Sequence, residues 1–198
     1  LLDNAKELTF TDSTGITNNT AISTTGGKLN ILKGKVIETT TAYITGSTGT
    51  LYMKPGTLYK VAKGNSAAGT SLSDQIPRVD GVSFAYNLEG GTIEFAGTGA
   101  DAFQTVRGGR TYPNLLFSGA NTYLTDYKNL SSNVTIDSSL QITGTSVVDC
   151  ISSAGTAQTF SGNGALIMDG GRIRFVKLNT AQPELNGTAK AYSLTGGN

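Results

Sequence analysis

The chain has 198 residues and a net charge of +1, so no global field draws it to nucleic acid or to an anionic membrane. It contains no histidine, which excludes Ser-His-Asp and Cys-His catalytic systems and the commonest zinc ligand. A single cysteine excludes an internal disulfide, and no apolar run is long enough to span a membrane. The 26 glycines, abundant serine and threonine, and short alternating apolar runs favour an all-β protein over a disordered chain.

The N-terminal third repeats one eleven-residue pattern. Residues 27–37 read GKLNILKGKVI and residues 49–59 read GTLYMKPGTLY, so the two copies begin 22 residues apart. In both copies apolar residues alternate at i and i+2, which places them on one face of a β-strand. Two pairs are expected to stack on adjacent coils: Leu29 on Leu51, and Ile31 on Met53.

The same region is rich in lysine, with six lysines and one glutamate between residues 26 and 66. A lysine stripe beside outward aromatic rings could contact an anionic polysaccharide. The residues predicted to make this contact are Lys33, Lys35, Lys54, Lys60, Tyr52 and Tyr59. The plainer interpretation is a solvated surface on which lysines discourage aggregation of sheet edges.

The rhythm breaks at residues 64–82, which hold few apolar residues and one proline. We therefore divide the chain into a first solenoid block at 1–63, an irregular loop or junction at 64–87, and a second block at 88–198. Because neither end resembles a polar cap, we expect the second block to continue beyond the chain end and the chain to have flanking repeats or domains of the same polypeptide as partners.

The second block repeats the pattern at a longer interval. GGTIEF at 90–95 matches GGRIRF at 170–175, and residues 164–174, GALIMDGGRIR, are a third copy of the eleven-residue pattern. Gly164 and Gly171 are expected to turn corners. The residues expected to point inward and stack are Ile93, Phe95, Leu166, Met168, Ile173 and Phe175.

Internal periods of this kind are typical of solenoids. Short strands separated by glycine-rich turns, with little sign of a 3.6-residue period, predict a parallel β-helix (β-solenoid) with coils of about 20–22 residues. Each coil buries little by itself, so stability would accumulate through contacts between neighbouring coils.

The stretch GGTIEFAGTGADAFQTVRGGRTYPNLLFSG, residues 90–119, resembles the Gly/Thr-rich repeats of large Bacteroidota cell-surface proteins. The similarity covers residues 88–198 well, including 134–136 and 140–142, and residues 26–62 loosely. It implies export by type IX secretion, an extracellular or outer-surface location, and a role as adhesin or stalk. It also implies the secretion machinery and surface polysaccharide as partners.

Little in the chain points to catalysis. Cys150 lies in the apolar run VVDCIS, which indicates a buried structural thiol, with Asp149 on the opposite face of the strand. The acidic residues are few and scattered, and no calcium-binding nonapeptide repeats occur. We therefore expect neither enzyme activity nor a catalytic residue, cofactor or metal site.

Three functions remain. The first is a structural or adhesive segment of a long secreted or cell-surface protein. The second is a carbohydrate-binding module on the same scaffold, and the third is a polysaccharide-degrading β-helix enzyme, whose acidic cleft would come from three consecutive coils.

Overall fold

The computed structural model describes residues 7–10, 16–17, 22–23, 27–37, 44–45, 48–62, 64, 74–75, 78–79, 83–99, 103–120, 127–150, 155–174 and 192–195. The strands of the N-terminal half are β1 (Glu7–Phe10), β2 (Ile16–Thr17), β3 (Ile22–Ser23), β4 (Gly27–Ile31), β5 (Lys35–Ile37), β6 (Ile44–Thr45), β7 (Thr48–Met53), β8 (Leu58–Val61), β9 (Asp74–Gln75), β10 (Arg78–Val79) and β11 (Ser83–Leu88). Those of the C-terminal half are β12 (Thr92–Phe95), β13 (Gln104–Val106), β14 (Arg110–Phe117), β15 (Lys128–Leu130), β16 (Val134–Asp149), β17 (Phe160–Gly162), β18 (Ala165–Arg174) and β19 (Tyr192–Thr195).

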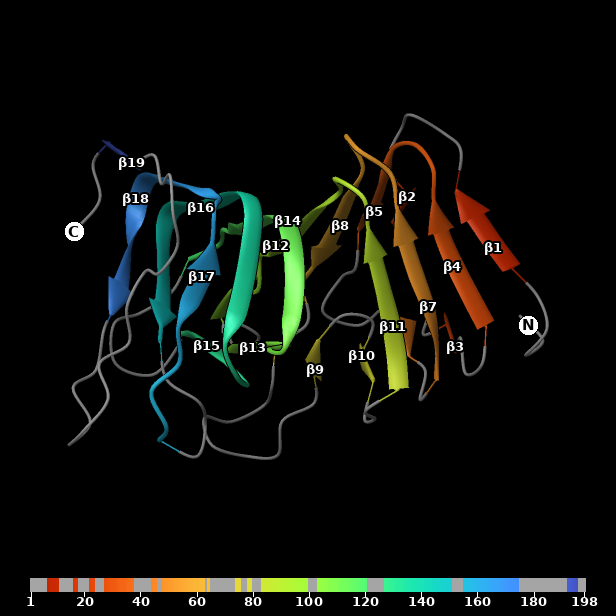
Figure 1. The fold of residues 1–198 in the computed structure, drawn as a ribbon, viewed down its shortest axis with the longest axis horizontal. Coiled ribbons are helices and arrows are strands. Elements are labelled where there is room, and N and C mark those ends of the chain that lie inside the picture. The colour runs from red at the N-terminus through yellow and green to blue at the C-terminus, as the bar shows by residue number, and fades with distance from the viewer. Residues whose placement is uncertain are drawn as a thin grey trace.

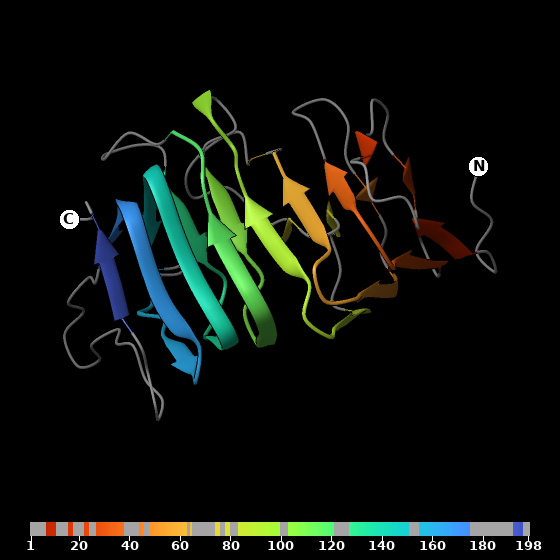
Figure 2. The same ribbon diagram turned by 90° about the horizontal axis from the view of Figure 1, so that it is seen from above.

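The protein is all-β, and its strands form a β-solenoid, as the sequence predicts (Figures 1 and 2). Two parallel sheets and one mixed sheet line the N-terminal half. Sheet A has the order β1-β4-β7-β11, and sheet B runs from β2 through β5, β8, β12 and β14 to β16, with β18 and β19 beyond. Sheet C has the order β3-β6-β10-β9, in which β9 and β10 pair antiparallel. Figure 2 shows sheet B as one row of parallel strands along the molecule.

The strands of the C-terminal half are longer because single strands continue round corners. β16 pairs through residues 134–136 with β17, through 139–144 with the start of β18, and through 147–149 with its end. The register shifts between Gly144 and Val147. One strand therefore serves three successive faces of a coil. The coils also lengthen here, since Leu166 pairs with a residue 26 positions earlier, Leu140, whereas Leu51 pairs with Leu29, 22 positions earlier.

The interior of the solenoid is a set of apolar stacks, and both predicted pairs are confirmed. Leu29 pairs with Leu51 and Ile31 with Met53, and all four side chains are fully buried. In sheet B the rings of Phe95 and Phe117 stack with their centroids 5.9 Å apart. The other predicted inward residues have these positions: Ile93, Leu166 and Met168 are buried, Ile173 is partly buried against the core, and Phe175 lies outside the described residues.

Glycines permit the tight corners between faces. Gly144 and Gly170 are in register on adjacent coils and have φ values of 64° and 94°, which favour glycine. A Cβ atom on Gly170 would lie 2.4 Å from the carbonyl oxygen of Gly144. Gly171 is also left-handed at a corner, as predicted, whereas Gly164 is required by close packing, because its Cβ would lie 2.5 Å from the Ile136 side chain.

The junction expected at residues 64–87 ends earlier than predicted. Residues 83–88 form β11, which pairs in register with β7 over its whole length. β12 then pairs with β8 on one side and β14 on the other, so sheet B crosses from the first block to the second without a break. The connection between β8 and β11 is longer than the one between β5 and β7, yet the strands on either side of it still meet their expected neighbours.

Sheet A, in contrast, ends at β11. Its neighbour in the next coil, the first part of β14, bonds to β16 and forms no ladder with β11 among the described strands. Figure 1 shows the two strands standing apart. Tyr86 pairs with Leu51 and faces inward as Leu51 does, but it is only partly buried because no strand of sheet A follows β11. The guanidinium of Arg110 lies 4.9 Å from the centroid of its ring. Such a cation–π contact covers an aromatic face that the next coil leaves open.

Candidate functional site

The predicted glycan-contact residues surround the corner between sheets A and B in the N-terminal half. Three turns stack there, one above another. Lys54 N–H donates to the carbonyl of Ile31 (3.0 Å), and Glu89 N–H donates to the carbonyl of Met53 (3.0 Å). Leu58 N–H donates to the carbonyl of Gly34 (3.1 Å). The ladder of sheet A thus continues into the turns and holds residues 32–34, 54–57 and 89–91 in a column.

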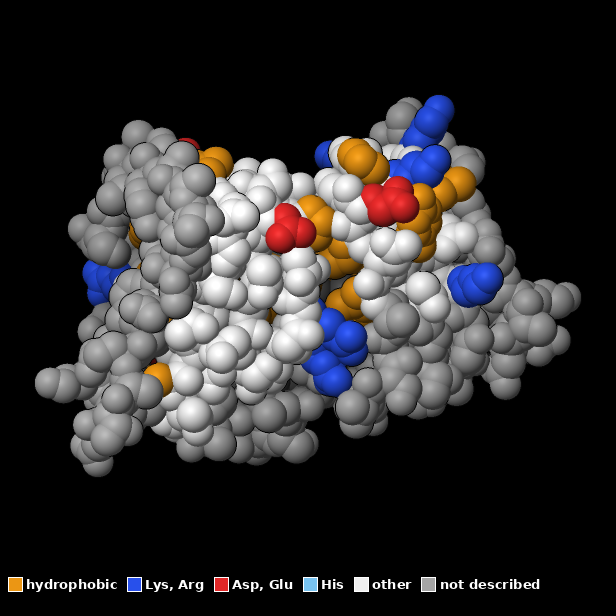
Figure 3. Space-filling model, viewed as in Figure 1, with side chains coloured by type: hydrophobic (Ala, Val, Ile, Leu, Met, Phe, Trp, Pro, Cys, Tyr) orange, Lys and Arg blue, Asp and Glu red, His pale blue; other side chains and the backbone are white. Residues whose placement is uncertain are grey.

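Four lysines decorate the first two of these turns and the strands beside them. Lys33 and Lys54 lie in consecutive turns, Lys28 lies on sheet A, and Lys35 begins β5 of sheet B. All four are exposed, and none forms an ion pair or a side-chain hydrogen bond with a described residue. We call these four residues the lysine corner. Figure 3 shows basic side chains gathered at this upper rim of the N-terminal half.

Tyr52 is the outward aromatic ring of this region, as predicted. It lies in register with Asn30 and Asn87 on the outer face of sheet A. Its hydroxyl donates a hydrogen bond of 2.8 Å to Oε2 of Glu89, the acidic residue of the third turn. This bond to the carboxylate raises the pKa of the Tyr52 hydroxyl, with smaller contributions from burial and from the charge of Glu89.

Tyr59 does not belong to the site, so the prediction that it is an outward aromatic is wrong. Its side chain is fully buried, in register between Val36 and Ile93 in the core. Lys60, the next residue, points outward, and its ammonium pairs with Glu94 at 3.3 Å. The same Oε1 atom of Glu94 accepts a hydrogen bond of 2.6 Å from the Ser118 hydroxyl. The charge of Lys60 is therefore already compensated, unlike that of the four corner lysines.

No protein-family model matches the chain, and no curated protein or solved structure is significantly similar to it. The function of the chain must therefore be argued from its own side chains.

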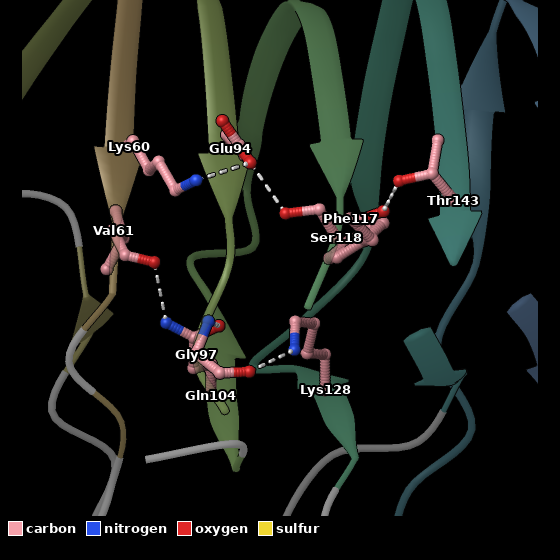
Figure 4. A network of polar contacts seen from close by, with 9 residues as sticks. All are labelled: Lys60, Val61, Glu94, Gly97, Gln104, Phe117, Ser118, Lys128 and Thr143. Atoms are coloured by element: carbon pink, nitrogen blue, oxygen red, sulfur yellow. Dashed lines mark hydrogen bonds and ion pairs between the residues drawn. The ribbon is translucent and has the colours of Figure 1, made fainter. Parts of the chain in front are cut away.

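A second corner, where the chain turns from β12 to β13 within sheet B in the C-terminal half, carries polar residues that the sequence did not single out as a site. Gln104 is fully buried, accepts a hydrogen bond of 2.9 Å from Gly97 N–H and donates one of 3.0 Å to the carbonyl of Val61 (Figure 4). Lys128, also fully buried, donates to the carbonyl of Gly97 at 3.4 Å. We call Gln104, Lys128 and the backbone groups that they bond the polar corner.

Both side chains point into the solenoid. Gln104 and Lys128 are in register, and they alternate with Val106 and Leu130, which belong to the core. A lysine in such a place loses hydration, and this burial lowers the pKa of Lys128 from its ordinary 10.5 to about 7. The signal in the sequence is the period-two pattern of K-N-L at 128–130, in which Lys128 takes the position of an inward apolar residue.

Cys150 is the buried thiol that the sequence predicts. It is fully buried in the core, and this burial, with a smaller effect of the Asp149 charge, raises its pKa to about 12. Asp149 points away from it and forms a bidentate ion pair with Arg174 on the neighbouring strand. The Arg174 guanidinium also lies 4.9 Å from the centre of the Tyr127 ring. These contacts tie β16, β18 and the segment before β15 together.

The described residues offer no arrangement typical of catalysis. No group of three or more His, Cys, Asp or Glu residues among them could hold a metal ion. Glu94 and Asp149 are bound to basic partners, and Asp137 and Asp169 are exposed on separate strand segments. The described residues contain no helix that is long and apolar enough to cross a membrane.

Proposed function

We propose that this chain is a structural or adhesive segment, a stalk or adhesin repeat, of a long secreted or cell-surface protein. The observation that carries the proposal is the continuous pairing of sheet B, which joins the coils from β2 to β18 strand by strand. In such a stack each coil lengthens the molecule by one strand spacing, about 4.8 Å. The N- and C-terminal strands lie at opposite ends of the stack, which suits a spacer (Figure 1).

The buried polar groups of the described residues support the same role. Gln104, Lys128 and the pair of Asp149 with Arg174 each bond to a neighbouring coil. Their chemistry is used to hold one coil to the next, and none of them lies at an open surface. The resemblance of residues 90–119 to surface repeats of Bacteroidota adds type IX export to the proposal.

The location is tested with an antibody raised against the 198-residue chain. Intact cells of the source organism should be labelled without permeabilisation, and labelling only after permeabilisation would overturn the proposal. The role is tested by replacing the chain, within its parent protein, by an unrelated solenoid of equal length. A spacer tolerates the exchange and an adhesive segment loses attachment, while release of sugar from a polysaccharide panel by the purified chain would reassign it as an enzyme.

A further inference from the structure

The lysine corner concentrates positive charge, and none of its four ammonium groups forms an ion pair with a described residue. Lys33 and Lys54 lie in turns of adjacent coils, and the strands on either side of those turns carry Lys28 and Lys35. Glu89, the acid of the third turn in the same column, is engaged by the Tyr52 hydroxyl. Like charges on neighbouring strands repel each other, so the corner as it stands costs some stability. A bound polyanion would relieve that repulsion.

The geometry of the corner favours an extended ligand over a compact one. Turns of adjacent coils lie about 4.8 Å apart along the axis of the solenoid, and two adjacent turns carry Lys33 and Lys54. This spacing is close to the length of one pyranose unit in an extended polysaccharide. The chain as a whole has a net charge of only +1, so the attraction is confined to this rim and does not extend over the molecule.

We propose that the lysine corner binds a polysaccharide that carries carboxylate groups, laid along the solenoid axis, with its uronate carboxylates on Lys33 and Lys54. The outward ring of Tyr52, oriented by its bond to Glu89, supplies an apolar surface for a sugar ring beside the ammonium groups. Lys35 flanks the path at the start of β5, and Lys28 adds charge farther away, near the start of β4 on sheet A. Polysaccharide is favoured over nucleic acid because the charge follows one narrow column instead of covering a face.

The test is calorimetric titration of the 198-residue chain with polygalacturonate, and with the same polymer after methyl esterification, which removes the charge but keeps the backbone. We expect saturable binding to the first, weakened by salt, and none to the second. The double substitution Lys33→Gln/Lys54→Gln should weaken binding at least about fivefold. Because both lysines are exposed, the far-ultraviolet circular dichroism of the variant should match that of the wild type.

A matched pair of substitutions separates local from global charge. Glu89→Gln removes one negative charge at the corner and should tighten binding about twofold, whereas Asp169→Asn makes the same charge change on exposed β18 and should leave binding unchanged. Equal binding of single-stranded DNA, equal effects of the two substitutions, or wild-type binding by the lysine variant would each overturn the proposal. None of these outcomes bears on the stalk role, which rests on the ladder of sheet B.

Discussion

The lysine corner and the polar corner use the same residue type in opposite ways. Lys33 and Lys54 are exposed, whereas Lys128 is fully buried with a pKa near 7. The two corners differ in how the backbone is satisfied. At the first, backbone bonds run from turn to turn, so the side chains are left for solvent. At the second, the N–H and carbonyl of Gly97 are bonded by side chains, which must therefore point inward, and the Val61 carbonyl accepts from Gln104 as well as from the backbone N–H of Ala96.

A buried lysine is tolerated at the polar corner because it is hydrogen-bonded there and because its lowered pKa lets it shed its charge near neutral pH. An exposed lysine keeps its charge and its freedom to meet a ligand. Whether a lysine side chain points into the solenoid or out into solvent thus decides whether it serves stability or recognition. The following substitutions test this distinction.

The largest expected effect is at Gln104. Replacement by leucine leaves the Gly97 N–H buried without its acceptor, while the Val61 carbonyl keeps its bond from the Ala96 N–H; the expected cost is up to about 3 kcal/mol in the free energy of unfolding. Urea denaturation followed by circular dichroism measures this loss. The control is Gln141→Leu, because Gln141 is half-buried on the outer face of sheet B and, among the described residues, its side chain bonds only Ser139. Equal losses in both variants would contradict a special role for the polar corner.

The second prediction concerns the pH dependence of stability. The pKa of Lys128 is about 7 in the folded chain and near its ordinary 10.5 in the unfolded chain. Between these values the unfolded chain binds more protons, so the free energy of unfolding rises with pH. From pH 6.5 to 8.5 this group should contribute a gain of about 2 kcal/mol, which Lys128→Met abolishes and Lys54→Met leaves intact. If Lys128→Met keeps the wild-type dependence of the free energy of unfolding on pH, another group is responsible for it.

At the lysine corner the effect on folding should be small. The double substitution Lys33→Gln/Lys54→Gln is expected to change the free energy of unfolding by no more than about 0.5 kcal/mol, because both side chains are exposed. The direction should be towards greater stability, most visibly at low salt, because the repulsion between the turns is relieved. A loss comparable to that of Gln104→Leu would show that these lysines are structural.

The smallest effect is at Tyr52. Since Glu89 accepts the hydrogen bond of its hydroxyl and raises its pKa, Glu89→Gln should lower that pKa towards the ordinary value without unfolding the chain. The ring resonances of Tyr52, assigned with Tyr52→Phe and followed by NMR against pH, measure the change. An unchanged titration would mean that the hydrogen bond does not persist in solution.

The apolar stacks were predictable from the sequence, whereas parts of the candidate site were not. Tyr59 is predicted to be an outward aromatic beside the lysines, but it lies two residues before Val61 and shares its inward face. The period-two pattern of residues 59–61 therefore already indicates a buried ring. The bond between Tyr52 and Glu89 joins residues 37 positions apart, across an insertion that hides the equivalence of the two turns.

By itself the sequence determined the class of fold, the pairing of Leu29 with Leu51 and of Ile31 with Met53, and the burial of Cys150. These follow from the alternation of apolar and polar residues along each strand and from the 22-residue offset between the two copies of the pattern. Only the tertiary structure decided where sheet A stops, which lysines are compensated, and that Gln104 and Lys128 face inward. Those outcomes depend on which backbone groups a neighbouring coil leaves unpaired, and that neighbour is 20 or more residues away along the chain.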